Sequence, residues 1–97
     1  MAERESVDLS ALIKAARLDA NDDDGHYPTG ALIVEKALHA EGLLGNLYVE
    51  GYFGTNSVDA YAAWQRSLGY SGKDADGIPG RKSLTALGRR HGFTVRD

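Results

Sequence analysis

The residues that could perform acid, base or nucleophilic chemistry in this chain are scattered along it rather than grouped. Histidines stand at His26, His39 and His91, without the His-x-x-x-His pair of a helical metal site. Ser57 and Ser83 lie outside any Gly-x-Ser-x-Gly nucleophile motif. The chain has no cysteine, which excludes disulfides, thiolate zinc sites and a cysteine nucleophile. We therefore expect no catalytic residue, no metal and no cofactor, and we interpret the chain as a non-enzyme.

The most acidic stretch, residues 19–25, has some of the character of a calcium loop. A twelve-residue calcium loop with Gly25 at its sixth position would begin at Ala20 and end at Ala31, and both ends require carboxylates. Because the pattern fails at both ends, we interpret the stretch as a solvated loop whose side chains bond to nearby backbone. A cation sensor around residues 22–24 is the lower-ranked alternative.

Aromatic side chains are the best candidates for binding a ligand. Phe53, Tyr61 and Trp64 fall at positions that a helical core would bury. Three other rings flank expected turns, namely Tyr48, Tyr52 and Tyr70. A ring at a turn can stack on the apolar face of a sugar or cover a methyl group, while its hydroxyl forms a hydrogen bond. These three tyrosines are therefore candidate binding residues.

Four helices are expected to position these side chains. Apolar residues at helical spacing predict helices over residues 9–18, 31–40, 55–68 and 80–91. Asp8 or Ser6 is a candidate cap for the first, and Gly92 is expected to end the last in a left-handed conformation, with Phe93 and Val95 folding back as an apolar tail. A chain of 97 residues allows one domain, which we place at 8–97 after a lead at 1–7. The predicted fold class is all-α.

One twelve-residue unit occurs twice, at residues 50–61 and 76–87. Both copies have an acid, a Gly, an apolar residue, a Phe or Pro and a second Gly, followed by Ser, an aliphatic residue and Ala at matching positions. The two glycines permit positive φ or a close backbone approach. Each copy therefore predicts a turn that leads into a helix.

This repeated pattern resembles the helical peptidoglycan-binding domain that is appended to bacterial and phage cell-wall hydrolases. The resemblance covers roughly residues 30–92. Tyr61 replaces the usual aliphatic residue, Trp64 the usual Phe and Tyr70 the usual Leu, and these exchanges keep size and apolarity. The resemblance implies a small orthogonal bundle of three to four helices with two Gly-x-[Phe/Pro]-Gly turns.

The resemblance also implies a function. It suggests a monomeric, non-catalytic module that binds peptidoglycan and targets a tethered hydrolase, such as an endolysin or autolysin. The module would act outside the cell at the bacterial wall, either exported or released by phage. We expect a ligand groove between the two turns, lined by Tyr48, Tyr52, Asn56, Tyr70 and Arg81, with Arg81 holding a stem-peptide carboxylate. A helical protein-interaction module without a wall ligand is the alternative.

Charge is distributed unevenly along the chain. The net charge is −3, but residues 1–50 carry ten acids and four bases, while residues 51–97 carry four acids and seven bases. Four of those bases fall in the last predicted helix: Arg81, Lys82, Arg89 and Arg90. We interpret Arg89 and Arg90 first as complements of the helix dipole, with ligand binding as the alternative. Nucleic acid is not expected without a strong overall positive field. No membrane contact is expected either, because no stretch approaches about 20 apolar residues.

Overall fold

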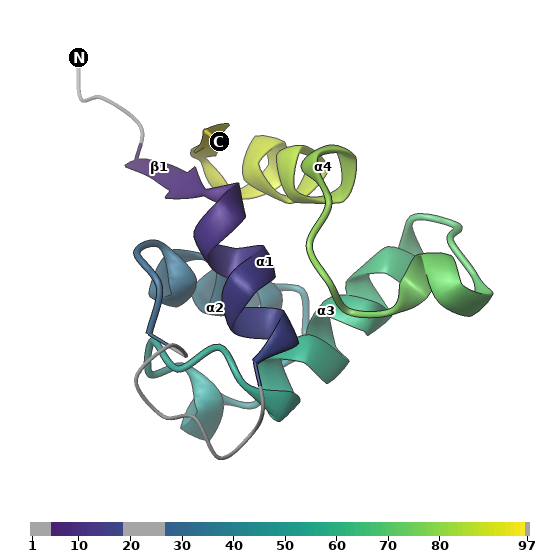
Figure 1. Ribbon diagram of the computed structural model, residues 1–97, viewed down its shortest axis with the longest axis horizontal. Helices are drawn as coiled ribbons and strands as arrows, with labels where there is room; N and C mark the ends of the chain where they lie inside the picture. The colour runs from purple at the N-terminus through teal and green to yellow at the C-terminus, as the bar shows by residue number, and fades with distance from the viewer. Residues whose placement is uncertain (1–4, 19–26, 97) are drawn as a thin grey trace.

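A computed structural model describes residues 5–18 and 27–96. The elements follow the order β1 (Glu5–Asp8), α1 (Leu9–Arg17), α2 (Ala31–Ala40), the 3-10 helix η2 (Asn46–Tyr48), α3 (Thr55–Ser67), the 3-10 helix η3 (Gly72–Ala75), α4 (Arg81–His91) and β2 (Phe93–Arg96). The structure is a small helical bundle with one pair of short strands (Figure 1). The acidic stretch 19–25 and His26 lie outside the described residues.

The predicted helices are confirmed, and each boundary lies within one residue of its expected position. Asp8 caps α1, because its side chain accepts a hydrogen bond from the backbone N–H of Ala11 at 3.2 Å. Gly92 ends α4 with φ of 84°, and its N–H donates to the carbonyl oxygen of Gly88. The predicted N-cap of α1 and the predicted C-terminal glycine of α4 are therefore both confirmed.

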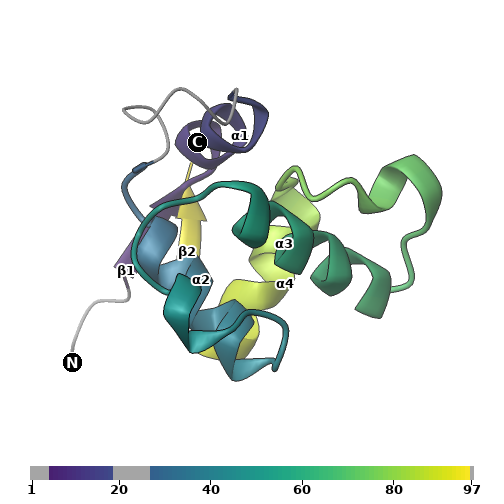
Figure 2. The ribbon, with the colours of Figure 1, turned by 90° about the horizontal axis from the view of Figure 1, so that it is seen from below.

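The parallel pairing of β1 with β2 was not predicted from the sequence. Glu5 pairs with Phe93 and Val7 with Val95, so residues from the expected lead and the expected apolar tail form one small sheet. Figure 2 shows the two strands side by side next to α2. Val7 and Phe93 are both buried. Residues 5–7 therefore pack together with the rest of the domain.

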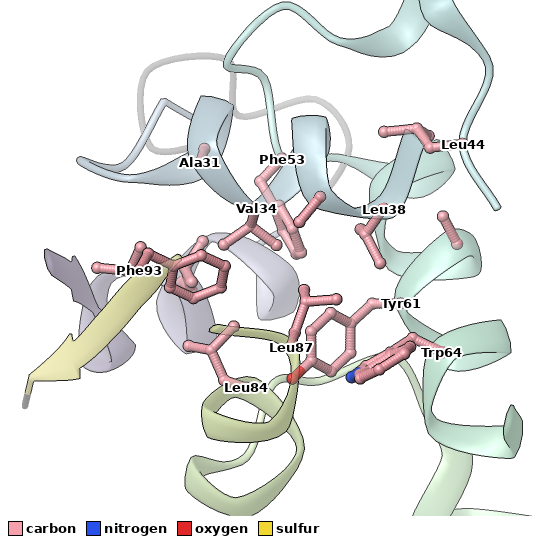
Figure 3. Close-up of a cluster of buried hydrophobic side chains, with 14 of the residues drawn as sticks. Ala31, Val34, Leu38, Leu44, Phe53, Tyr61, Trp64, Leu84, Leu87 and Phe93 are labelled. Atoms are coloured by element: carbon pink, nitrogen blue, oxygen red, sulfur yellow. The ribbon is translucent and has the colours of Figure 1, made fainter. Parts of the chain in front are cut away.

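The hydrophobic core lies where the helices and β2 converge (Figure 3). Phe53, Tyr61 and Trp64 are buried, as the sequence predicts. The core also contains apolar side chains from the other elements, among them Val7, Leu12, Val34, Leu38, Leu84, Leu87 and Phe93. Full burial of a side chain of this size contributes about 1.5–3 kcal/mol. The core therefore fixes the directions in which the polar faces of α3 and α4 point.

Buried polar contacts join α3 to α4. The hydroxyl groups of Tyr61 and Ser83 lie 2.6 Å apart, and the indole Nε1 of Trp64 donates to the carbonyl oxygen of Ser83 at 2.9 Å. Burial raises the pKa of Tyr61 above its ordinary value. Both aromatic rings thus bury an apolar body while their polar atoms are satisfied. This contact fixes the first turn of α4, which carries Arg81 and Lys82.

Candidate functional site

Two short glycine-containing segments share one backbone arrangement. We call residues 50–54 the first glycine segment and residues 76–80 the second. Gly51 has φ of 87° and Gly77 has φ of 82°, in the left-handed region that favours glycine. The last residue of each segment, Gly54 or Gly80, has an extended backbone and precedes the first residue of α3 or α4. The two segments therefore match in conformation as well as in sequence.

A buried carboxylate anchors the first glycine segment. Glu35 of α2 is 0% exposed. Its Oε1 accepts hydrogen bonds from the backbone N–H groups of Glu50 at 3.0 Å and Gly51 at 2.7 Å, and its Oε2 accepts one from the hydroxyl of Ser57 at 2.7 Å. Burial raises the pKa of Glu35, and the three hydrogen bonds oppose that rise. The carboxylate therefore ties α2 to the start of α3 through the segment between them.

A buried amide anchors the second glycine segment in the same way. Oε1 of Gln65 in α3 accepts a hydrogen bond from the backbone N–H of Gly77 at 2.8 Å, while its Nε2 donates to the carbonyl oxygen of Ile78 at 3.0 Å. Gln65 is buried, like Glu35. In both cases, the anchor comes from the helix that precedes the segment.

Sequence reasoning did not identify these two anchors. Glu35 lies on the buried face of α2, four residues after Ala31 and three before Leu38. A polar residue at a buried helical position, upstream of an acid-Gly pair, is the signal that could have found it. Gln65 occupies such a position on α3, because it is a buried polar residue upstream of the Asp76-Gly77 pair.

The first glycine segment forms one side of a small hollow that we call the first hollow. Its volume is about 30 Å³, and it is lined by Tyr48, Glu50, Tyr52, Gly54, Thr55, Asn56 and Ser57. Tyr48 is 44% exposed. Tyr27 packs edge-on against Tyr52, with ring centroids 5.2 Å apart. The first hollow is thus a small depression whose lining includes Tyr48 and Tyr52.

The second glycine segment lies beside a larger hollow, the second hollow. Its volume is about 430 Å³, and it is lined by Gln65, Tyr70, Lys73, Asp74, Asp76, Ile78, Gly80, Arg81, Lys82 and Ser83. Asp76 is engaged within the segment, since its Oδ1 accepts a hydrogen bond from the backbone N–H of Ile78 at 2.9 Å. This volume is in the range of small-ligand sites, and charged side chains of both signs surround it.

The structure divides the five predicted site residues between the two hollows. Tyr48, Tyr52 and Asn56 line the first hollow, whereas Tyr70 and Arg81 line the second. Among the described residues, these two hollows share no lining residue, so neither hollow brings all five predicted residues together. The physical reason is the position of α3. The first glycine segment leads directly into the start of this helix, while Gln65, near its other end, holds the second segment.

The described histidines and serines that could take part in chemistry each bond to a partner of their own. Nδ1 of His39 lies 2.8 Å from the carbonyl oxygen of Leu44, and Nε2 of His91 lies 2.7 Å from Oε2 of Glu41. Ser57 and Ser83 are buried and hydrogen-bonded. Within residues 5–18 and 27–96, no group of three or more His, Asp or Glu side chains is placed to hold a metal ion.

None of the helices in the described ranges is long and apolar enough to cross a membrane.

Comparison with known proteins gave no match. No protein-family model matches the chain, and no curated protein or solved structure is significantly similar to it. What the chain binds is therefore inferred from its own residues.

Proposed function

We propose that this chain is a non-catalytic module that binds the peptidoglycan of the bacterial cell wall and targets a tethered wall hydrolase to it. The observation that supports the proposal is the matched pair of glycine segments. The residues that carry the sequence resemblance, 50–61 and 76–87, also share left-handed glycines and buried polar anchors. Each segment borders a hollow that is open to solvent and lined by tyrosine. This doubled arrangement favours a fold of the peptidoglycan-binding type.

The first hollow suits the glycan part of the wall. The rings of Tyr48 and Tyr52 can stack on the apolar faces of sugars, and the amide of Asn56 can both donate to and accept from an N-acetyl group. A small site is sufficient for one stretch of a long polymer, because the ligand continues beyond the site at both ends. We assign the glycan to this hollow.

The second hollow suits the stem peptide. Arg81 can bind a free carboxylate through two parallel N–H···O bonds, while Tyr70 covers a D-amino-acid methyl group. Two weak contacts on one polymer are sufficient for targeting, because tethering raises the effective concentration of the attached enzyme at the wall.

Sedimentation with purified sacculi tests this proposal. The double variant Tyr48→Ala/Asn56→Ala removes two side chains of the first hollow, and neither side chain is buried. We expect about tenfold weaker binding, equivalent to about 1.4 kcal/mol. Leu32→Ala, an exposed site on α2 outside both hollows, should bind as the original chain does. Failure of the folded original chain to sediment would overturn the proposal, and equal binding by the double variant would overturn the role of the first hollow.

A protein-interaction module is the second candidate, and one observation favours it. Leu47 of η2 is 85% exposed, its neighbour Tyr48 is 44% exposed and Tyr27 is 62% exposed. Leu47 and Tyr48 are neighbours in η2, and exposed apolar side chains that lie together are typical of contact surfaces. A chain of this kind would not sediment with sacculi. Leu47→Ser would weaken its binding to a protein partner while leaving its melting temperature unchanged.

A further inference from the structure

The basic residues of α4 fall into two groups with different surroundings. Nε of Arg90 lies 3.3 Å from Oε2 of Glu41, and the guanidinium lies 5.8 Å from the ring centroid of Trp64. His91 contacts the same carboxylate at 2.7 Å. These contacts tie the end of α4 to the rest of the domain. The remaining basic residues of the helix, Arg81, Lys82 and Arg89, are exposed on another part of its surface.

These exposed residues share one face of α4. Arg81, Thr85 and Arg89 follow one another at four-residue spacing, which places them in one row along a helix. A hollow of about 550 Å³ runs along this face, lined by Arg81, Lys82, Thr85, Ala86 and Arg89. It shares Arg81 and Lys82 with the second hollow, which adds Lys73 from η3. We call this continuous surface, from Lys73 to Arg89, the basic groove.

Positive charge predominates in the basic groove. Two carboxylates, those of Asp74 and Asp76, also line the second hollow, and Asp76 is engaged by the N–H of Ile78. Within the described ranges, no carboxylate lies within salt-bridge distance of Lys73, Lys82 or Arg89. The chain as a whole carries a net charge of −3, so this positive surface is a local feature. Such a surface attracts anions to one side of the molecule.

We propose that the basic groove binds a flexible phosphodiester polymer without bases, of the glycerol phosphate type. Arg81 and Arg89 are eight residues apart, which corresponds to about 12 Å along the helix axis, further than one phosphate can span. An anion whose charges repeat along a chain can contact Lys73, Arg81 and Arg89 in succession. The open groove leaves room for the chain to enter and leave. This ligand goes beyond the proposed function, because its recognition requires no contact with sugar or peptide.

Nucleic acid fits the basic groove less well. The described lining contains one aromatic ring, Tyr70, whereas single-stranded nucleic acid is typically held by several rings that stack on successive bases. A polymer that offers phosphates without bases needs only the basic side chains that line the groove.

Isothermal titration with soluble polyglycerol phosphate tests this inference. We compare the original chain with Lys82→Gln/Arg89→Gln, and with Lys14→Gln/Arg17→Gln on α1 as a control that removes the same charge from other exposed positions. The groove variant should bind at least tenfold more weakly, and the control within about twofold of the original chain. If each lost contact contributes a log–log salt slope of about −0.7, the slope should weaken by about 1.4 in the groove variant. Thermal melts establish that all three chains are folded.

Three results would overturn the inference. The first is no polymer binding by the folded original chain. The second is an equal loss of polymer binding in the α1 control, which would show that the effect depends on net charge and not on the groove. The third is tighter binding of an oligothymidylate of equal charge, which would assign the groove to nucleic acid. The two proposals share Arg81 and the second hollow, but their tests change different residues. The sacculus test changes Tyr48 and Asn56 of the first hollow, whereas the polymer test changes Lys82 and Arg89, so the two proposals can fail separately.

Discussion

The carboxylate of Glu35 and the carboxamide of Gln65 bind equivalent backbone groups. Oε1 of Glu35 lies 2.7 Å from the N–H nitrogen of Gly51, and Oε1 of Gln65 lies 2.8 Å from that of Gly77. The other polar atom of each side chain has a different partner. In Glu35 it accepts a hydrogen bond from Ser57, and in Gln65 it donates one to Ile78. One anchor can therefore carry charge, while the other must be a neutral amide.

Removal of the Glu35 acceptor is expected to destabilise the fold severely. Glu35→Ala leaves the N–H groups of Glu50 and Gly51 without this acceptor, at about 1–3 kcal/mol for each unsatisfied group. The Ser57 hydroxyl keeps a second acceptor, the carbonyl oxygen of Tyr52 at 3.2 Å. In Glu35→Gln, the side-chain oxygen still accepts from the two N–H groups, and the new NH₂ group can donate to the Ser57 hydroxyl. The unfolding free energy of this variant should therefore lie within about 1 kcal/mol of that of the original chain. Urea denaturation measures the unfolding free energies of both variants. Equal losses in the two variants would contradict this account.

The reverse exchange at the second anchor should fail. In Gln65→Glu, a carboxylate oxygen would face the carbonyl oxygen of Ile78, where the present amide donates at 3.0 Å. The carboxylate must either remain protonated or repel this carbonyl, so a loss of about 2 kcal/mol or more is expected at neutral pH. The loss should diminish in acid, as the new carboxyl group takes up a proton. A variant as stable as the original chain at pH 7 would show that the Ile78 contact contributes little.

The raised pKa of Glu35 predicts that its contribution to stability decreases as pH rises. Between the unfolded pKa of about 4.5 and the higher folded pKa, the folded chain binds more protons than the unfolded chain. The contribution of Glu35 to stability therefore falls as pH rises through this window, by about 1.4 kcal/mol for each pH unit between the two pKa values. Because Glu35→Gln lacks this contribution, its stability relative to the original chain should increase from pH 4 to 7. A constant difference would argue against a raised pKa.

Gly77 and Gly51 provide a matched pair for testing close packing. Their φ angles are nearly equal, at 82° and 87°, so an alanine at either position carries a similar backbone cost of about 1–2 kcal/mol. A Cβ at Gly77 would collide with the backbone carbonyl oxygen of Val58, whereas a Cβ at Gly51 would meet nothing within 4 Å. We expect Gly77→Ala to be less stable than Gly51→Ala by about 1–3 kcal/mol in thermal or urea unfolding. Equal losses would mean that the second segment can move away from α3.

Loss of the Tyr61 hydroxyl should weaken the contact between α3 and α4. Tyr61→Phe removes the 2.6 Å hydrogen bond to Ser83, at a cost of about 1 kcal/mol near pH 7. Because burial raises the pKa of Tyr61, the original chain loses stability as pH rises above about 10, and the variant should lose less. The difference in unfolding free energy between the original chain and Tyr61→Phe should therefore become smaller at alkaline pH. Tyr48→Phe, at an exposed ring, is the control and should leave stability unchanged.

The helices and the aromatic core could be predicted because their signals are local. The cap at Asp8, the left-handed Gly92 and the spacing of Tyr61 and Trp64 each depend on a few neighbouring residues. The burial of Glu35 could not be predicted in this way. A charged residue on a helix is normally exposed, and its burial here depends on donors that come 15 to 22 residues later in the chain.

The candidate site was predictable only within each glycine segment. Tyr48, Tyr52 and Asn56 are close in sequence, and they line one hollow. Tyr70 and Arg81 lie on either side of η3, which the sequence did not predict, and the contact of Gln65 with Gly77 places them apart from the first hollow. The helix-dipole interpretation likewise treated Arg89 and Arg90 alike. The contacts of Arg90 with Glu41 and Trp64 distinguish it from Arg89.

The pairing of β1 with β2 has a consequence for the order of folding. Its contacts close a loop of nearly the whole described chain, since the hydroxyl of Thr94 donates to the carbonyl oxygen of Glu5 across 89 positions. Loop closure of this length becomes favourable only after the helices have brought the strands together, so the pair should form late. Chain ends usually fray, but this pair buries Val7 and Phe93 in the common core. The strand amides that bond across the pair should therefore exchange with deuterium only when the whole domain unfolds, so that their exchange rate reports global stability.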